Sequence, residues 1–393
     1  MNKLYLLLAA IVLSLAACTK SFDEKADSSS VMIGGGAYSS ILSGGGGTGN
    51  GSDSTIPSSI LTAGEWNDLD NWNFLQNLYN TNDTISRSQS YWGFYCKHKW
   101  LFQVTDANQK PVENAVIAIT SNGKHVYTAR TNKFGKAHIL PAIFDSVLAS
   151  SYNYTISYNG ITASNGKLST ANQTINYSLP TAATVFNAVD IMFVIDATGS
   201  MGDELEYLKN ELYNVLSRAD SALTGRTVRY SSVFYRDMGD DYLTKPYDFT
   251  TNKSAVVNFV KAQSAGGGGD TPEAVDEGLT AALNQQWSAN AHCKLMFLIL
   301  DAPPHDNKMN IVRNKVKEAA DKGIMLIPVA ASGTDKSTEF LLRYMAIATN
   351  GTYTFLTDHS GVGNAHTTPT IGDYKVEFLN NLMVRLISKY AGN

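Results

Sequence analysis

The sequence predicts an α/β protein with a doubly wound, mostly parallel sheet in its C-terminal half, preceded by a small all-β sandwich. Continuous apolar runs such as Ile191–Ile195 and Leu295–Leu300 are typical of strands covered on both faces. Segments with helical periodicity lie between these runs. Within residues 97–181, alternating apolar residues and Asn-Gly pairs predict short strands joined by turns, which favours a sandwich.

The elements expected within residues 185–393 alternate between strand and helix. Strands are predicted at Ile191–Ile195, Tyr230–Tyr235, Leu295–Leu300 and Ile324–Val329, and helices at Leu205–Ala219, Val256–Val260, Glu273–Leu283, Phe340–Ala348 and Val376–Tyr390. This order gives a mostly parallel sheet with helices on both faces. Binding sites in such sheets lie at the carboxyl ends of the strands.

Composition sets limits on function. The chain has 393 residues, enough for two or three domains, and 44% of them are hydrophobic, enough for a sizeable core. A formal net charge of −4 gives no reason to expect nucleic-acid binding, which needs a basic face. After the first twenty residues, no apolar run is long enough to span a bilayer. We therefore expect the mature chain to be soluble apart from its N-terminus.

Residues 1–17 have the pattern of a bacterial signal peptide. Lys3 supplies a positive charge, Leu4–Leu15 form a short apolar run, and two alanines precede Cys18. Small residues followed by a cysteine resemble the lipobox of bacterial lipoproteins, which implies that Cys18 carries lipid; the alternative is an ordinary cleaved signal peptide. The acidic pair shortly after Cys18 resembles the export signal of Bacteroidetes surface lipoproteins. It implies an outer-membrane protein, exposed at the cell surface or facing the periplasm.

Two segments separate this leader from the sandwich. Residues 18–58 are rich in glycine and serine and predict a flexible tether. Residues 59–96 are rich in aromatic side chains, among them Trp66, Trp72 and Trp92. We expect these aromatics to pack against the following domain, rather than to form a sugar-binding platform, because large aromatics mostly serve burial.

Residues 97–181 resemble the carboxypeptidase-regulatory-like β-sandwich. The resemblance rests on Pro111–Ala115, which enters a strand, and on Thr131–Gly135, which forms a turn. It implies a spacer without chemistry of its own. Cys96 before the sandwich and Cys293 after it are expected either to form a disulfide, as an exported protein allows, or to remain two buried thiols.

Side chains that carry oxygen gather at three predicted loops on one edge of the sheet. Asp196, Thr198 and Ser200 follow the first apolar strand at alternate positions of a turn, where they can aim three oxygens at one point. Asp301 ends another strand, and the glycine-rich loop 266–273 precedes a helix. Oxygen ligands of this kind suit a hard divalent cation, with Mg²⁺ favoured and Mn²⁺ or Ca²⁺ as alternatives.

This pattern resembles the metal-ion-dependent adhesion site of the von Willebrand factor A (VWA) family. The family motif is Asp-x-Ser/Thr-x-Ser, then Thr, then Asp. The motif positions are matched in order by Asp196, Thr198, Ser200 and Asp301. The resemblance covers residues 185–393 and implies a VWA domain that holds one divalent cation.

The glycine-rich loop departs from the family motif. Where the family has Thr, this sequence has Asp270 with Thr271 beside it, and either could be the ligand. Direct binding of Asp270 would place three carboxylates around the ion and weaken its attraction for an acidic ligand. On that hypothesis, Asp270→Thr strengthens the binding of a ligand that carries a carboxylate.

Two further groups leave alternatives open. His305 is either a general base beside a metal-bound water, as in a hydrolase, or a loop residue that shapes the ligand surface. The second is favoured because the sequence offers no paired base or nucleophile. Asp237, Asp240 and Asp241 either hold calcium or form a solvated turn, and a turn is the commoner outcome for clustered aspartates.

The expected protein is a cell-envelope lipoprotein, not an enzyme. It binds a protein ligand or a surface polymer through a divalent cation at the VWA domain, and lipid on Cys18 holds it to the membrane. Two alternatives remain: a structural subunit of an envelope assembly, and a metal-dependent hydrolase that uses His305.

Overall fold

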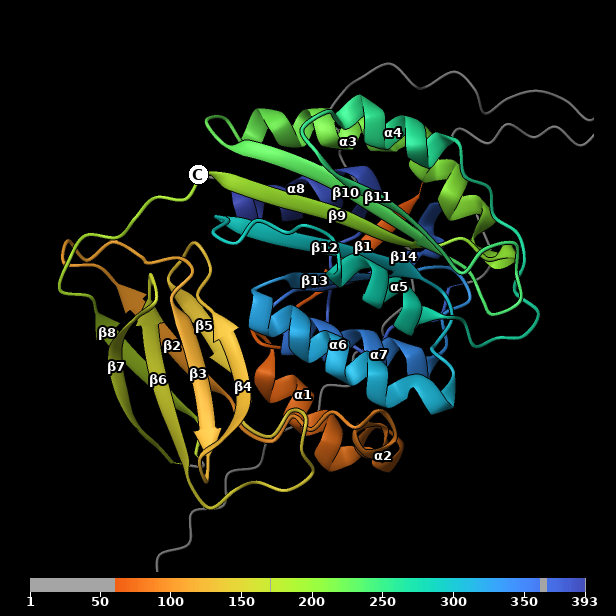
Figure 1. The fold of residues 1–393 in the computed structure, drawn as a ribbon. Coiled ribbons are helices and arrows are strands. Elements are labelled where there is room, and N and C mark those ends of the chain that lie inside the picture. Colours follow the sequence, from red (N-terminus) through yellow and green to blue (C-terminus); the bar gives the residue numbers. More distant parts are fainter. Residues whose placement is uncertain (1–60, 170, 361–365, 393) are drawn as a thin grey trace, which may run out of the picture. The chain divides into compact units, whose positions relative to one another are not determined.

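The computed structural model describes residues 61–169, 171–360 and 366–392 (Figure 1). The expected signal peptide, lipidated Cys18 and tether all lie outside the described residues. Within the described part of the chain, no helix is both long enough and apolar enough to cross a membrane.

An eight-stranded sheet forms the centre of the α/β part (Figure 1). In sheet order its strands are β11 (Thr244–Thr250), β10 (Thr227–Tyr235), β9 (Ala188–Asp196), β12 (Cys293–Leu300), β13 (Met325–Ala330), β14 (Tyr353–Thr357), β1 (Thr62–Trp66) and β15 (Glu377–Phe378). The strands from β10 to β14 are parallel, whereas β11 and β1 pair antiparallel with their neighbours. The predicted fold class, a mostly parallel sheet after an all-β region, is confirmed.

Helices cover both faces of the sheet, because successive side chains of a strand point to opposite faces. In β9, Ile191 and Phe193 pack with one set of helices, and Met192 and Val194 with the other. The first set is α3 (Gly202–Ala222), α4 (Lys253–Lys261) and α8 (Leu379–Ala391), and the second is α5 (Val275–Leu283), α6 (Met309–Lys322) and α7 (Lys336–Ala348). Short 3₁₀ turns occupy Gly199–Met201, Asp306–Lys308 and Asp358–Ser360.

The all-β region consists of two packed sheets. One sheet has the order β5 (Lys136–Ile139), β2 (Trp100–Thr105), β8 (Gln173–Ser178), and the other β4 (Lys124–Arg130), β3 (Val116–Ser121), β6 (Tyr152–Tyr158), β7 (Ile161–Leu168). Aromatic pairs join the sheets, Trp100 with Tyr152 and Phe102 with Tyr154, each with ring centroids 5.3 Å apart. Asn159 and its neighbouring glycine adopt positive φ at the β6–β7 turn, as the turn signal predicts.

The sandwich packs directly on the α/β part. Asn350 accepts a hydrogen bond from the backbone of His138 at 2.6 Å and donates one back to its carbonyl at 2.9 Å. The Tyr127 hydroxyl donates to the carbonyl of Ala348, at the end of α7. A continuous group of buried side chains connects the two regions. The sandwich therefore shares a core with the α/β part, whereas the sequence predicted only a spacer.

The segment 59–96 was expected to lie outside the α/β part, and its described residues correct this boundary. Its strand β1 adds to the sheet beside β14, and its helices are α1 (Trp72–Thr81) and α2 (Asp83–Trp92). Trp66, Trp72 and Trp92 are buried in the common core, as the packing interpretation predicted. Cys96 and Cys293 are both free and buried, so the two-thiol alternative holds.

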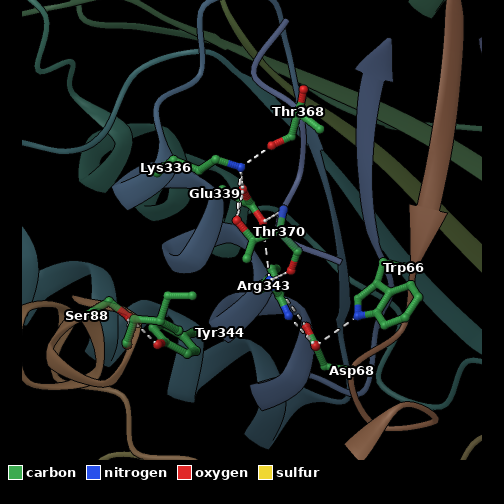
Figure 2. A network of polar contacts seen from close by, with 10 residues as sticks. Trp66, Asp68, Ser88, Lys336, Glu339, Arg343, Tyr344, Thr368 and Thr370 are labelled. Atoms are coloured by element: carbon green, nitrogen blue, oxygen red, sulfur yellow. Dashed lines mark hydrogen bonds and ion pairs between the residues drawn. The ribbon is translucent and has the colours of Figure 1, made fainter. Parts of the chain in front are cut away.

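A buried ion cluster fixes this segment to α7 (Figure 2). Arg343 is fully buried and donates to Asp68 at 2.9 Å and 2.7 Å. Its third nitrogen donates to the carbonyl of Thr370 at 2.7 Å and lies 3.3 Å from Glu339. The Trp66 indole donates to Asp68 at 3.0 Å. Two segments distant in sequence, the turn after β1 and the segment before β15, are thus held by one guanidinium.

Two predicted helix starts were wrong. The helix expected from Glu273 begins at Val275, because Glu273 is held in a β-bridge with Pro304. The helix expected from Val376 begins at Leu379, because residues 377–378 pair with β1 as strand β15.

Candidate metal-binding site

Asp196 is the last residue of β9, at the carboxyl edge of the sheet, and is fully buried. Its Oδ1 accepts hydrogen bonds from the backbone N–H of Thr198 at 2.9 Å and from the Thr198 hydroxyl at 2.7 Å. Its Oδ2 is buried without a hydrogen-bond partner of ordinary geometry, although the buried Tyr235 hydroxyl lies near enough to lower the pKa of Asp196. Burial, together with the charge of Asp301, raises the pKa of Asp196 to about 7 against the lowering effect of the Thr198 bonds. An unpartnered carboxylate oxygen in the interior is costly unless a ligand satisfies it.

Asp301 follows β12 directly and lies beside the first loop. The parallel pairing of Ile299 with Ile195 places it at the same sheet edge as Asp196. Burial raises the pKa of Asp301, and a hydrogen bond from Ser200 opposes the rise. Its Oδ1 is also buried without a partner, whereas Ser200 is exposed. The structure therefore brings together the residues that the motif predicted on these two loops.

The glycine-rich loop lies against the first loop. The backbone N–H of Gly199 donates to the carbonyl of Gly267 at 3.2 Å. Gly267 and Gly268 have φ values of 78° and 68°, which favour glycine. A Cβ on Gly268 would lie 2.8 Å from Glu273 Oε1 and 3.2 Å from Thr198 Cβ. These two glycines permit an approach that side chains would block.

Asp270 and Thr271, the two alternatives for the ligand on this loop, are both exposed. Across the described ranges, no three His, Cys, Asp or Glu side chains are arranged to hold a metal ion. The choice between Asp270 and Thr271 as the ligand on this loop stays a prediction.

Glu273 is a further site residue, one that the motif did not single out. It is 3% exposed, and its Oε2 is buried without a partner. Burial raises the pKa of Glu273 to about 9, and the charges of Asp196, Asp237 and Asp301 add to the rise. Its backbone N–H donates to the carbonyl of Pro303 at 2.9 Å. The sequence offered one signal for Glu273: an acidic residue just before the apolar first turn of a predicted helix, a position at which its carboxylate becomes buried.

Glu204, in the first turn of α3, is a second buried acid near the site. Its Oε1 accepts hydrogen bonds from the backbone N–H of Ser332, at 3.0 Å, and from the Ser332 hydroxyl. Its Oε2 is buried without a partner. Burial raises the pKa of Glu204, and the charge of Asp301 adds to the rise. Glu204 therefore ties the loop after β13 to the helix that follows the first site loop.

His305 and the acidic loop after β10 form a connected group. His305 Nε2 lies 2.8 Å from Asp237 Oδ1, so this histidine is not solitary. Asp240 accepts hydrogen bonds from the backbone N–H groups of Asp237, at 3.0 Å, and of Gly268, at 2.9 Å. Asp241 is exposed. The described aspartates do not converge as a calcium site; Asp240 instead holds the acidic loop against the glycine-rich loop.

The residues at this edge fit a divalent cation. Asp196 and Asp301 each keep one buried carboxylate oxygen free of partners. Thr198 and Ser200 supply hydroxyl oxygens beside them. Hard cations bind such oxygens and retain water or ligand at the remaining positions, and Ser200 lies on the exposed side.

A sequence profile of the von Willebrand factor A domain matches residues 190–368. The chain carries a VWA domain. Two curated relatives match part of it: an ariadne-like RING finger protein of Acanthamoeba polyphaga mimivirus, 34% identical over 130 residues (33% of this chain, 12% of that protein), and an alpha-protein kinase of Dictyostelium discoideum, 27% identical over 140 residues (35% and 22%). The chain spans less than a quarter of the length of either relative.

Solved structures with similarity to this chain include bacterial proteins. The pilus adhesin SpaC of Lactobacillus rhamnosus GG in its open conformation is 15% identical, with 62% of this chain and 32% of the adhesin covered and a TM-score of 0.36. The conserved hypothetical protein BatB of Bacteroides thetaiotaomicron is 16% identical, with 52% and 86% covered and a TM-score of 0.28. Similarities this distant do not assign a ligand to the chain.

Proposed function

We propose that this protein is a cell-envelope adhesion-type lipoprotein that binds a protein ligand or a surface polymer through one divalent cation, Mg²⁺ in preference to Mn²⁺ or Ca²⁺. Asp196, Thr198, Ser200 and Asp301 hold the cation, and the ligand completes its coordination from the open side. Lipid on Cys18 anchors the chain at the outer membrane, with the binding part at the cell surface or in the periplasm.

One observation carries the proposal: the buried carboxylate of Asp196 and the partly buried carboxylate of Asp301 lie at the same sheet edge, and each keeps one buried oxygen without a hydrogen-bond partner. Bringing like charges together in the interior raises their pKa values and costs free energy. A bound cation would neutralise both charges, which supports a binding role for an arrangement that is unfavourable alone. A cation held there would also attract an acidic group of the ligand.

The experiment is a calorimetric titration of Mg²⁺ and of Ca²⁺ into the metal-stripped full chain. The full chain is used because β1 belongs to the sheet. We expect saturable binding that is lost in the double variant Asp196→Ala, Asp301→Ala. A matched control, Asp248→Ala with Asp373→Ala, removes two exposed carboxylates and should bind normally. Absence of binding to the wild type, or binding retained by the site variant, would contradict the proposal.

Asp270→Thr belongs in the same titration. Because Asp270 is exposed, we expect its removal to change the cation affinity by less than about tenfold, the lower range for groups outside the ligand shell. A larger loss would restore Asp270 as a direct ligand, and stronger binding of a carboxylate-bearing ligand would support its role in weakening that contact.

One observation favours the alternative hypothesis that the protein is a hydrolase: the contact between His305 and Asp237. A carboxylate that orients a histidine is a common feature of general bases. We nevertheless propose that the protein is not an enzyme, and expect no metal-dependent turnover of generic ester substrates. Turnover that disappears in His305→Gln would support the hydrolase, and a fixed partner that co-purifies without added metal would support an assembly subunit.

A further inference from the structure

A groove of about 650 Å³ lies between α2 and α7, outside the cation site. Its size falls within the range of about 300–1,000 Å³ common for ligand pockets. Ile85 and Phe340 form its apolar floor and are 7% and 3% exposed. Tyr91 lines it while 50% exposed, which is high for a large aromatic side chain.

The wall of the groove is held in place by hydrogen bonds (Figure 2). Lys336 Nζ lies 3.0 Å from Glu339 and donates to the Thr370 hydroxyl at 2.9 Å. On the α2 side, the hydroxyls of Ser88 and Tyr344 share a hydrogen bond of 2.6 Å. Both walls are therefore fixed to the ion cluster or the core, and the groove exists before any ligand binds.

The charged residues that line the groove are both positive, Arg87 and Lys336. Lys336 is already paired with Glu339. Arg87 is exposed, and its Nε donates to the carbonyl of Asp83 at 3.3 Å. Among the residues that the structure describes, its terminal nitrogens make no hydrogen bond. An apolar floor with a free guanidinium at its rim is complementary to a ligand that is both apolar and anionic.

The groove also opens towards the site edge of the sheet. The Tyr91 hydroxyl donates to Asp306 at 2.8 Å. Asp306 lies in the loop that begins with Asp301 and includes His305. The other wall, α7, begins after β13, at the same carboxyl edge. The groove and the candidate cation site therefore lie towards the same edge of the sheet.

We propose that the groove between α2 and α7 binds an acidic peptide segment of the ligand, with an apolar side chain on Ile85 and Phe340 and a carboxylate on Arg87. The choice of a peptide rests on the proposed function; the affinity of the groove for an apolar anion does not need the cation. The groove thus distinguishes between ligands that would bind the cation alone with similar affinity.

The test uses anilinonaphthalene sulfonate (ANS), an apolar anion, with the full chain in EDTA. We expect saturable fluorescence that Thr84→Trp, which fills the groove, weakens by about tenfold or more, the loss typical of a blocked central pocket. Ser90→Trp is the matched control, because Ser90 is exposed on the same helix and does not line the groove. Arg87→Glu should weaken binding by roughly three- to fivefold, as for an exposed ion pair.

A second step identifies the occupant. An acetylated peptide of Leu, Phe and Glu residues should displace ANS, and its Gln counterpart should do so less well. ANS binding that is absent, or unchanged in Thr84→Trp, overturns the groove as a site; equal displacement by both peptides overturns the acidic ligand. Because EDTA removes the cation, failure of the cation site leaves these outcomes unaffected.

Discussion

Two regions of this protein contain buried carboxylate oxygens. In one region these oxygens have hydrogen-bond and ion-pair partners, and in the other some of them have none. In the ion cluster of α7, the oxygens of Asp68 and Glu339 are all satisfied, by Arg343, Lys336, the Trp66 indole and Thr370. At the candidate cation site, Asp196, Asp301 and Glu273 each keep a buried oxygen without a partner.

Whether a buried carboxylate is paired indicates whether it stabilises the fold or is available to a ligand. A paired and fully hydrogen-bonded buried charge holds elements together and needs nothing from outside the fold. An unpaired one costs free energy unless a ligand or water satisfies it. Single unpartnered carboxylate oxygens also occur at Asp276 and Asp321, so the candidate cation site is marked by the gathering of Asp196, Asp301 and Glu273. The satisfied carboxylates mark the attachment of the residues after β1 to α7.

Removal of the central guanidinium should have the largest effect. Arg343→Met leaves Asp68 and Glu339 buried without their main partner, which we expect to lower the free energy of unfolding by about 3–5 kcal/mol. Urea unfolding followed by tryptophan fluorescence measures this, and Trp66 reports directly on the cluster.

The matched control is Arg385→Met. Arg385 pairs with Glu65 and Glu377, but its side chain is 43% exposed. The expected loss is below about 1 kcal/mol, as for surface ion pairs. Similar losses in the two variants would show that the ion cluster is no more important than a surface pair.

Isosteric substitutions at the two sites should have opposite signs. Asp68→Asn removes the charge that balances Arg343 and should destabilise the protein by about 2–4 kcal/mol. Asp196→Asn can still accept both Thr198 bonds and removes an unpartnered charge, so in EDTA it should stabilise the protein by about 1–3 kcal/mol. Thermal melting in EDTA and in Mg²⁺ tests both. Destabilisation by Asp196→Asn in EDTA would refute the assignment of Asp196 as an uncompensated charge.

Much of the sheet and the motif loops could be predicted because their signals are local. The run Ile191–Ile195 predicts a strand covered on both faces, and Asp196 with its alternating hydroxyls predicts oxygen ligands at its end. The turn before β7 is marked by Asn159 and a glycine, which tolerate the positive φ observed there.

The features that could not be predicted from the sequence depend on contacts between residues far apart in the chain. Arg343 and Asp68 are separated by 275 positions, and no periodicity marks them as partners. The two-residue pairing of β15 with β1 also leaves no local signal in the sequence. The last helix was therefore predicted to begin too early. Glu273 became a site residue only because the fold buries its carboxylate beside those of Asp196 and Asp301.

A titratable group can also be buried in its neutral form, as at His138. Its substitution has the smallest expected effect on the free energy of unfolding. Burial lowers the pKa of His138 to about 4, and the charges of Lys99 and Lys136 add to the decrease. Its Nδ1 is buried without a partner. In the unfolded chain, a histidine binds its proton near pH ~6.5. Between that value and about 4, only the unfolded state gains the proton, so stability is lost as the pH falls through this window.

His138→Gln removes this titration while the backbone bonds to Asn350 remain possible. We expect the variant to lose less stability than the wild type between about pH 7 and about pH 5, with a difference of about 1–2 kcal/mol. Urea unfolding at the two pH values measures it. An equal loss in both proteins would mean that a neutral buried histidine does not contribute to the acid sensitivity of the fold.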